Sequence, residues 1–241
     1  MTIVLLILLA ILLLFYFKFS AFCTIMATQS YQRGQIESAF NWFSKAEQRG
    51  MDMNQKITYA YYLLREGKVE KSEELLKAVL AETGQSQLKN LAKANYATLL
   101  IRTGRVAEAI EELEEILPYF KNTTVYGSLG YAYILAGDLE KAEAFNKEAY
   151  EYNSDNAIIL DNMIQLYTKL SDYETAYTYV KKQDEKGPGF IEAFYNMAVV
   201  EKALGKTEDA IEHLERALSI RPTFLSAVNH DDVKALLETI Q

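Results

Sequence analysis

The stretch that decides the fold is FYNMAVVEKALGKTEDAIEHLERALSIRP, residues 194–222. Two segments with helical apolar spacing flank Gly205, and Ala210 follows this glycine five positions later. This combination of a turn residue and a small residue occurs six times, at Gly34/Ala39, Gly67/Ser72, Gly104/Ala109, Gly137/Ala142, Ser171/Ala176 and Gly205/Ala210. The turn residues are 33, 37, 33, 34 and 34 positions apart. A fixed period of this length indicates stacked helix pairs rather than one globular core.

The composition of the 241-residue chain agrees with an all-α fold. It has only three prolines, and the segments between turns are 12 to 16 residues long and rich in Ala, Leu, Glu, Lys and Tyr. No long stretch alternates apolar and polar residues as a strand would. The net charge of −8 argues against nucleic-acid binding, which needs a basic surface to neutralise phosphates.

Residues that support metal or covalent chemistry are few. The single cysteine, Cys23, excludes an internal disulfide or a cysteine-cluster metal site. His213 and His230 lack metal-binding spacing, so we expect solvated or hydrogen-bonded surface histidines. No phosphate-binding glycine loop, carboxylate pair or Ser/His/Asp set stands out. We therefore expect no enzyme activity, no cofactor and no small-molecule substrate.

The N-terminus carries a long apolar run, in which residues 3–17 contain no charge. Residues 1–22 are long enough for a transmembrane anchor if the Lys18 ammonium reaches the interface. A cleaved signal peptide and a lipoprotein anchor at Cys23 are the alternatives, and Phe22 disfavours both. Residues 18–65 have a net charge of +3 and the later residues −11. By the positive-inside rule, the sequence predicts a single-pass cell-membrane protein with a cytoplasmic body.

Each repeat can be numbered so that its turn residue is position 15. Glycine there suits a left-handed helix end, and the small residue at position 20 lets the paired helices approach closely. Positions 7, 8 and 11 of the first helix should pack on position 24 of the second. From the second repeat onward these are Tyr59, Ala60, Leu63 and Leu76; Tyr96, Ala97, Leu100 and Leu113; Leu129, Gly130, Tyr133 and Asn146; Met163, Ile164, Tyr167 and Val180; and Met197, Ala198, Glu201 and Leu214. Asn146 and Glu201 depart from this apolar pattern.

This pattern resembles the tetratricopeptide repeat (TPR) family over roughly residues 20–222. It is clearest in Tyr126-x2-Leu129-Gly130-x2-Tyr133-x3-Gly137-x4-Ala142-x6-Ala149, and in residues 194–222. The resemblance implies a right-handed α-solenoid of about six helix pairs in residues 23–222. The interval of 37 predicts a longer loop near residues 83–86. The first helix of repeat one falls on about residues 20–32, directly after the apolar run. Residues 223–241 should form a C-terminal capping helix, with Asp231 or Asp232 as its N-cap.

The resemblance also implies a binding groove, lined by first-helix positions 2, 5, 6, 9, 12 and 13. An asparagine at position 6 often holds a ligand's peptide backbone in related proteins, because one amide both donates and accepts. The predicted peptide-binding residues are Tyr61, Arg65, Asn95, Arg102, Tyr131, Asn162, Lys169, Asn196 and Lys202. The alternative is that these side chains only solvate the face. No repeat has the Lys and Asn of the family's clamp for acidic C-terminal tails; positions 5 and 9 of repeat five, for example, are Asp161 and Gln165.

An acidic run, Glu108, Glu111, Glu112, Glu114 and Glu115, falls on the second helix of repeat three. A solvated outer face is its simplest interpretation, and docking of a basic partner is the alternative.

Together these features predict a membrane-anchored scaffold or adaptor that binds protein or peptide partners at the cytoplasmic membrane face, a membrane protein among the candidates. An extracytoplasmic assembly factor or chaperone is one alternative, and a noncatalytic subunit of a membrane complex is another.

Overall fold

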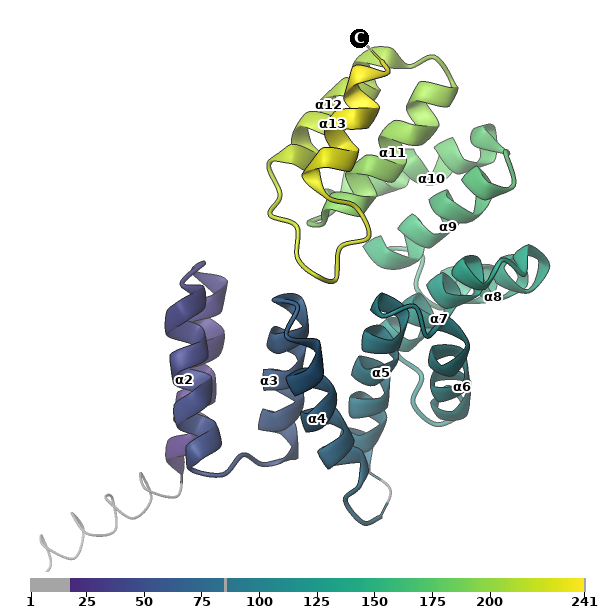
Figure 1. Ribbon diagram of the computed structural model, residues 1–241. Helices are drawn as coiled ribbons and strands as arrows, with labels where there is room; N and C mark the ends of the chain where they lie inside the picture. Colours follow the sequence, from purple (N-terminus) through teal and green to yellow (C-terminus); the bar gives the residue numbers. More distant parts are fainter. Residues whose placement is uncertain (1–17, 85, 241) are drawn as a thin grey trace, which may run out of the picture. The chain divides into compact units, whose positions relative to one another are not determined.

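The computed structural model describes residues 18–84 and 86–240, and all regular secondary structure in these residues is helical. A helix occupies residues 18–32, and twelve more follow (Figure 1). Their bounds are α2 Ile36–Gln48, α3 Met53–Arg65, α4 Val69–Leu80, α5 Gln87–Arg102, α6 Val106–Ile116, α7 Thr123–Ala136, α8 Leu139–Tyr152, α9 Ala157–Lys169, α10 Tyr173–Lys186, α11 Ile191–Ala203, α12 Thr207–Leu218 and α13 His230–Glu238. The predicted six helix pairs and final helix are thus present in the described residues.

The structure contradicts the predicted membrane localisation. Within residues 18–84 and 86–240, no helix combines the length and apolar character that a membrane crossing needs. Most of the predicted anchor, residues 1–17, lies outside the described residues. Its last part, residues 18–22, belongs to the first helix of repeat one, where Ser20 is buried and its hydroxyl donates to Gln55 Oε1 at 2.6 Å. The prediction of a single-pass anchor with a cytoplasmic body was therefore wrong for the residues that the structure describes.

The six turn residues adopt the left-handed conformation that the sequence predicts. The φ angles are 76° at Gly34, 70° at Gly67, 80° at Gly104, 82° at Gly137 and 73° at Gly205. Ser171, at the same position of repeat five, has φ 58° and is the one non-glycine residue with positive φ among the described residues. Glycine is favoured here because a Cβ would approach the following carbonyl.

A Gly137→Ala substitution should lower the free energy of unfolding by about 1 kcal/mol, because alanine is strained at positive φ. A Cβ at Gly137 would meet nothing within 4 Å, so the effect is purely conformational. Gly189→Ala is the matched control: its Cβ also has open space, but φ is not positive. Urea unfolding of both variants tests this, and equal midpoints would contradict it.

The 37-residue interval does not simply lengthen a loop. Helix α5 has 16 residues, whereas α3, α9 and α11 have 13 and α7 has 14. It starts 17 residues before its turn residue, Gly104, whereas α3, α7, α9 and α11 start 14 residues before their turn residues. The three extra residues therefore extend α5 at its beginning, next to the connection 81–86.

The chain forms two compact units. Unit 1 comprises residues up to Leu63 together with Lys68–Lys89, and unit 2 comprises Leu64–Gly67 with all residues from Asn90. In unit 1, the fully buried Phe43 ring stacks on Tyr59 with 4.6 Å between ring centroids. Cys23 is a free, buried cysteine in this core.

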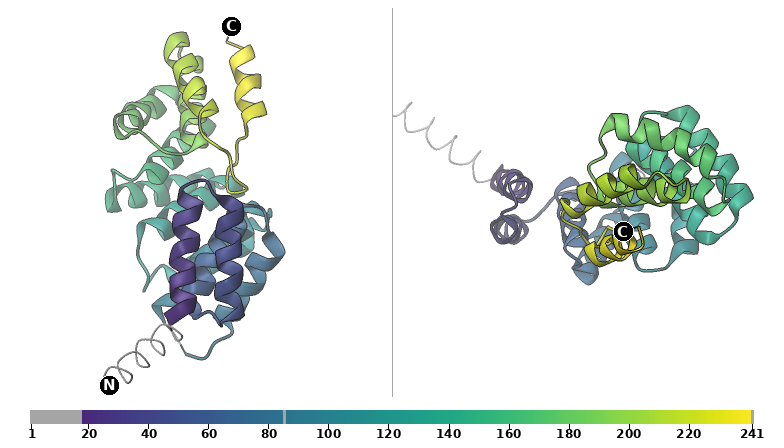
Figure 2. Two further views of the ribbon diagram at one scale, coloured as in Figure 1. Left: turned by 90° about the vertical axis from the view of Figure 1, so that its left-hand side faces the viewer. Right: turned by 90° about the horizontal axis from the view of Figure 1, so that it is seen from above.

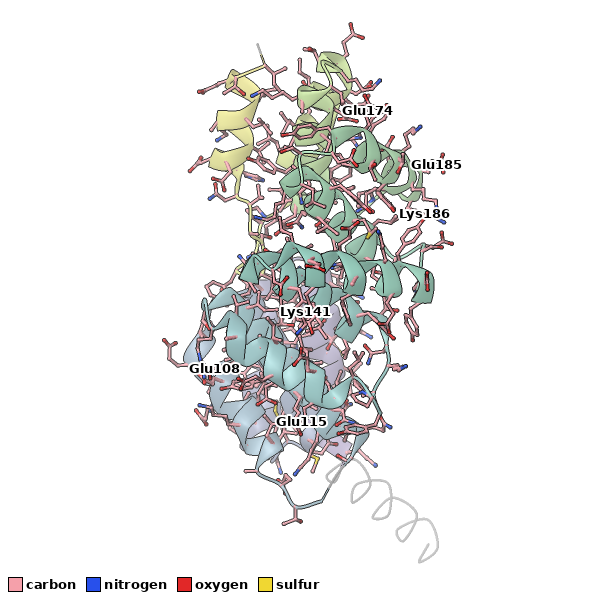
Figure 3. The ribbon with its side chains drawn as sticks, turned by 90° about the vertical axis from the view of Figure 1, so that its right-hand side faces the viewer. Glu108, Glu115, Lys141, Glu174, Glu185 and Lys186 are labelled. Carbon is pink, nitrogen blue, oxygen red and sulfur yellow. The ribbon has the colours of Figure 1, made fainter. Side chains whose placement is uncertain are left out.

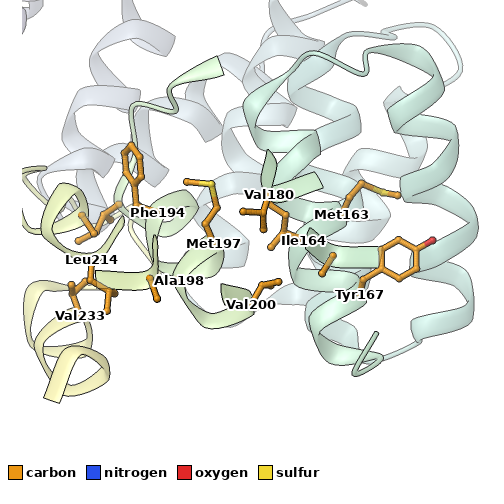
Figure 4. Packing of buried hydrophobic residues seen from close by; sticks show 14 residues of the cluster. Met163, Ile164, Tyr167, Val180, Phe194, Met197, Ala198, Val200, Leu214 and Val233 are labelled. Atoms are coloured by element: carbon orange, nitrogen blue, oxygen red, sulfur yellow. The ribbon is translucent and has the colours of Figure 1, made fainter. Parts of the chain in front are cut away.

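Unit 2 contains a continuous apolar cluster that runs from α9 to α13 (Figure 4). Met163, Val180, Met197 and Leu214 are at most 1% exposed in it. Helix α13 adds the fully buried Val233 to this cluster. Burial of these side chains supplies most of the stabilisation, roughly 1.5–3 kcal/mol for each large one.

The N-cap of α13 differs from the prediction. It is Asn229, whose side chain accepts from Asp231 N at 2.7 Å and Asp232 N at 3.1 Å. The Asp232 carboxylate in turn accepts from Asn229 N at 2.8 Å, which completes a capping box. Asp231 and Asp232 thus lie in the first turn of the helix, where carboxylates stabilise it through the helix dipole.

All the packing positions named from the sequence are buried, including the two polar exceptions. Asn146 Nδ2 donates to Gly130 O at 3.1 Å and to Ala142 O at 2.9 Å. This side chain fills the space that a Cβ at Gly130 would need. The asparagine at position 24 therefore depends on the glycine at position 8 of the same repeat.

Glu201, the other exception, pairs with a histidine that is not on the surface. His213 is 5% exposed, and its Nδ1 lies 2.7 Å from Glu201 Oε2 while Nε2 lies 3.2 Å from Asp184 Oδ1. Burial acts to lower the pKa of His213, but the hydrogen bonds and charges of these carboxylates outweigh it and raise the pKa above its usual value. The surface prediction for His213 was therefore wrong because its partners lie on two neighbouring helices, α10 and α11.

Candidate protein-binding surface

The predicted groove residues lie on the first helices of the repeats. In unit 2 these are α5, α7, α9 and α11, of which α9 packs directly on both α7 and α11. We call the side chains of Arg102, Tyr131, Asp161, Gln165, Glu192 and Asn196, which these four helices contribute, the first-helix face.

Arg102, at the end of α5, binds the loop that joins α12 to α13. Its Nε donates to Phe224 O at 3.2 Å, and its Nη2 donates to Ser226 O. The loop is itself a tight turn, because Ser226 N donates to Thr223 O at 2.9 Å and Thr223 N donates to Ser226 Oγ at 3.1 Å. Figure 2 shows this loop running out from α12 and turning back into α13. Arg102 therefore holds two main-chain carbonyls of a β-turn.

Glu192, at the start of α11, holds the other side of the same loop. Its carboxylate accepts from Ala227 N. Burial raises the pKa of Glu192, although the main-chain N–H groups and the charge of Arg102 act in the opposite direction. Arg102 and Glu192 together supply the face with a donor and an acceptor matched to polypeptide main chain.

Asp161 is the buried acid of the face, 4% exposed. Asn196 Nδ2 donates to its Oδ1 at 2.9 Å, and Gln165 Nε2 donates to its Oδ2 at 2.7 Å. Burial raises the pKa of Asp161 to about 7, against the lowering effect of both amides, and the charge of Glu192 adds to the increase. The face thus contains a carboxyl that changes protonation near neutral pH.

Tyr131 lies half-buried on α7. Burial raises the pKa of its phenol, which also interacts with Arg102, Asp161 and Glu192. Four charged or phenolic groups from α5, α7, α9 and α11 therefore influence one another on this face.

The structure brings three of the predicted residues together: Arg102, Tyr131 and Asn196. Arg65 contributes its carbonyl, which accepts from Phe224 N at 2.9 Å. Lys202 is exposed, and its ammonium donates to Thr239 Oγ1 at 2.6 Å, next to the end of α13. Lys169 is exposed on α9, and Tyr61 is 38% exposed in unit 1.

The remaining two asparagines bond within the repeats. Asn162 is 1% exposed, and its Nδ2 donates to Gly127 O at 2.8 Å between α9 and α7. Asn95 Nδ2 donates to Leu91 O at 2.9 Å in its own helix. The peptide-binding role of both residues stays a prediction, and in this structure their amide N–H groups bind the protein's own backbone.

Glu192, Asp161 and Gln165 were missing from the predicted set of binding residues, although Asp161 and Gln165 occupy groove positions 5 and 9 of repeat five. A signal for Asp161 exists in the sequence. Asn196 and Asp161 are 35 residues apart, and so are Asn162 and Gly127. A position-6 asparagine therefore meets position 5 of the preceding repeat, so an acid at that position predicts a buried pair.

The acidic run on α6 is largely paired within the protein. Lys93 Nζ lies 2.6 Å from Glu115 and 3.0 Å from Glu112, while Lys141 Nζ lies 2.8 Å from Glu114. Arg105 binds Glu108 at 2.6 Å. Figure 3 labels Glu108 and Glu115 of this run, together with Lys141, in one view. These internal partners favour the solvated outer face over docking of a basic partner.

The stacked helix pairs define a helical-repeat protein. The family description "Tetratricopeptide repeat" matches residues 63–130, 123–156 and 191–224, which together cover more than half of the chain. The chain belongs to the tetratricopeptide repeat family, as its repeat pattern predicted.

Curated relatives match parts of much longer proteins. Cellulose synthase operon protein C of Pseudomonas fluorescens is 27% identical over 176 residues, which cover 70% of this chain and 14% of that protein. TPR repeat-containing protein YvcD of Bacillus subtilis is 30% identical over 97 residues, which cover 40% of this chain and 18% of that protein. The chain thus spans less than a fifth of the length of these two relatives.

Solved structures share the fold. A tetratricopeptide repeat protein from Parabacteroides merdae superposes with a TM-score of 0.75 at 16% identity, over 92% of this chain and 84% of that one. PilW, described as a type IV pilus biogenesis factor, gives a TM-score of 0.67 at 17% identity, over 84% of this chain and 93% of that one. At this identity the similarity establishes the fold alone.

Proposed function

We propose that this TPR chain is a noncatalytic scaffold that binds polypeptide partners on the first-helix face of unit 2. The observation that carries the proposal is the binding of main-chain groups by Arg102 and Glu192. Arg102 donates to two carbonyl oxygens, and Glu192 accepts from one amide. Side chains that bind the main chain recognise a peptide conformation rather than one particular side chain.

The chemistry around these two residues supports a peptide ligand. Tyr131 offers an aromatic ring, and Gln165 and Asn196 offer amides that reach the buried Asp161. The face mixes one cation, two carboxyls and neutral polar groups, which favours a neutral or weakly charged peptide over a strongly acidic or basic one.

Binding of peptides to the full chain tests this function. A random peptide library is selected on the immobilised chain, and the selected peptides are measured by fluorescence anisotropy. Arg102→Ala and Glu192→Ala should each weaken binding by about tenfold or more, because each removes hydrogen bonds that involve a charged group. Arg33→Ala changes an exposed arginine in unit 1 and is the control. Selected peptides that bind both variants as tightly as the unmodified chain would refute the proposal.

A further inference from the structure

We propose that residues 223–227 are an internal occupant of the first-helix face, and that the partner's binding element is a hydroxyl-closed β-turn that displaces them. This inference rests on the proposed function, because it identifies the peptide class that the face accepts. The occupant belongs to the segment between α12 and α13, two helices that also pack directly on each other.

The contacts between the face and the turn involve main-chain atoms of the turn. Arg102 binds the carbonyls of Phe224 and Ser226, and Glu192 binds the N–H of Ala227. Arg65 O adds a contact to Phe224 N at 2.9 Å. A different chain that folds into the same turn would present the same groups in the same places.

The side chains that close the turn point to its chemical class. The Thr223 hydroxyl accepts from Leu225 N at 3.3 Å, and the Ser226 hydroxyl accepts from Thr223 N at 3.1 Å. Ser and Thr stabilise such turns by binding nearby main-chain groups. The matching partner is therefore a peptide with Ser or Thr at the first and fourth turn positions.

The turn can leave without opening the core. Residues 219–229 contain no helix, and Phe224 is 37% exposed. Helix α13 is attached independently, through the buried Val233 and its contacts with α12. Departure of the turn would leave the half-buried charges of Arg102 and Glu192 without these partners, which is costly. An incoming turn of the same type would restore the same hydrogen bonds.

A peptide added in trans tests this inference. The probe is a fluorescein-labelled peptide with the sequence of residues 220–228, IRPTFLSAV. The full chain carries Thr223→Ala with Ser226→Ala, which loosens the internal turn and leaves Arg102 and Glu192 intact. The probe should bind this variant about tenfold more tightly than the unmodified chain, because a competing occupant reduces apparent affinity. Adding Arg102→Ala should abolish the gain, and Ser219→Ala, whose hydroxyl bonds only Arg216 O among the contacts described, is the control.

Hydrogen exchange at Ala227 N reports the internal turn directly. The Ala227 amide should exchange faster in the Thr223→Ala, Ser226→Ala variant than in the unmodified chain. If it exchanges equally slowly, the turn has not been released, and the double variant Phe224→Gly with Thr223→Ala takes its place. If exchange shows that the turn is released and the probe still binds the variant and the unmodified chain with equal affinity, the internal-occupant proposal is overturned. If library-selected peptides still require Arg102, the proposed function stands in that case; if no peptide binds either chain, both proposals fail.

Discussion

Gly130→Ala is expected to lower the free energy of unfolding by about 3 kcal/mol, because it overfills a closed site and disturbs buried hydrogen bonds. A Cβ at Gly130 would lie 2.2 Å from Asn146 Oδ1 and 3.0 Å from Asn162 Nδ2. Asn146 is fully buried, so its amide has no open space to enter. Any movement breaks its bonds to Gly130 O and Ala142 O.

Urea unfolding followed by circular dichroism measures this effect. Gly127→Ala, one turn earlier in α7, is the matched control, because its Cβ would contact the Ile158 side chain at 2.9 Å. Ile158 is 48% exposed and can move, so we expect a loss of about 1 kcal/mol there. Asn146→Ala should recover part of the loss in the Gly130→Ala background. Equal losses for the two glycine variants would refute the steric explanation.

Asp161→Asn is expected to stabilise the protein at pH 8 by roughly 2–4 kcal/mol and to have little effect at pH 4. The pKa of Asp161 is raised to about 7 by burial, so the folded protein holds a proton that the unfolded chain has already lost. The stability that this carboxyl contributes is complete below its ordinary pKa and is lost as the pH rises through about 7. An amide at this position carries no charge and avoids the loss. Glu192, Arg102 and Tyr131 face the same region, and the raised pKa of Glu192 acts in the same direction as that of Asp161.

Unfolding free energies from pH 4 to pH 8 test this prediction. The difference between Asp161→Asn and the unmodified chain should grow between about pH 4 and pH 7 and then stay level up to pH 8. Glu174→Gln, an exposed carboxylate on α10, should show no such growth. Carbon-13 NMR of the Asp161 carboxyl gives an independent measurement, and a titration midpoint near that of an ordinary aspartate would contradict the argument.

Much of the fold could be predicted because its determinants are local and recur with one period. The turn residues, including Ser171, were identified from spacing. Their positive φ angles suit glycine, which has no Cβ, and Ser171 adopts the same conformation. Apolar spacing identified the buried positions for the same reason. The N-cap of α13 was misplaced because Asn229 and Asp232 bond reciprocally, and a single capping residue cannot be selected from several polar neighbours without that geometry.

The binding surface was only partly predictable, because the environment of a side chain depends on the adjacent repeat. Asn162 and Asn196 share position 6, and each meets position 5 of the preceding repeat. Asn162 meets Gly127 and bonds its backbone, whereas Asn196 meets the carboxyl of Asp161. Asn95 bonds its own helix instead. The same residue at the same repeat position therefore has three different environments.

The sequence by itself determined the repeat, the helix pairs, the turn conformations and the core positions, since each depends on neighbours within about one repeat. Only the tertiary structure decided which polar residues meet on the first-helix face. It also decided that Arg102 binds Phe224, a residue 122 positions away. Contacts over that distance depend on how successive repeats stack, and no local spacing records this.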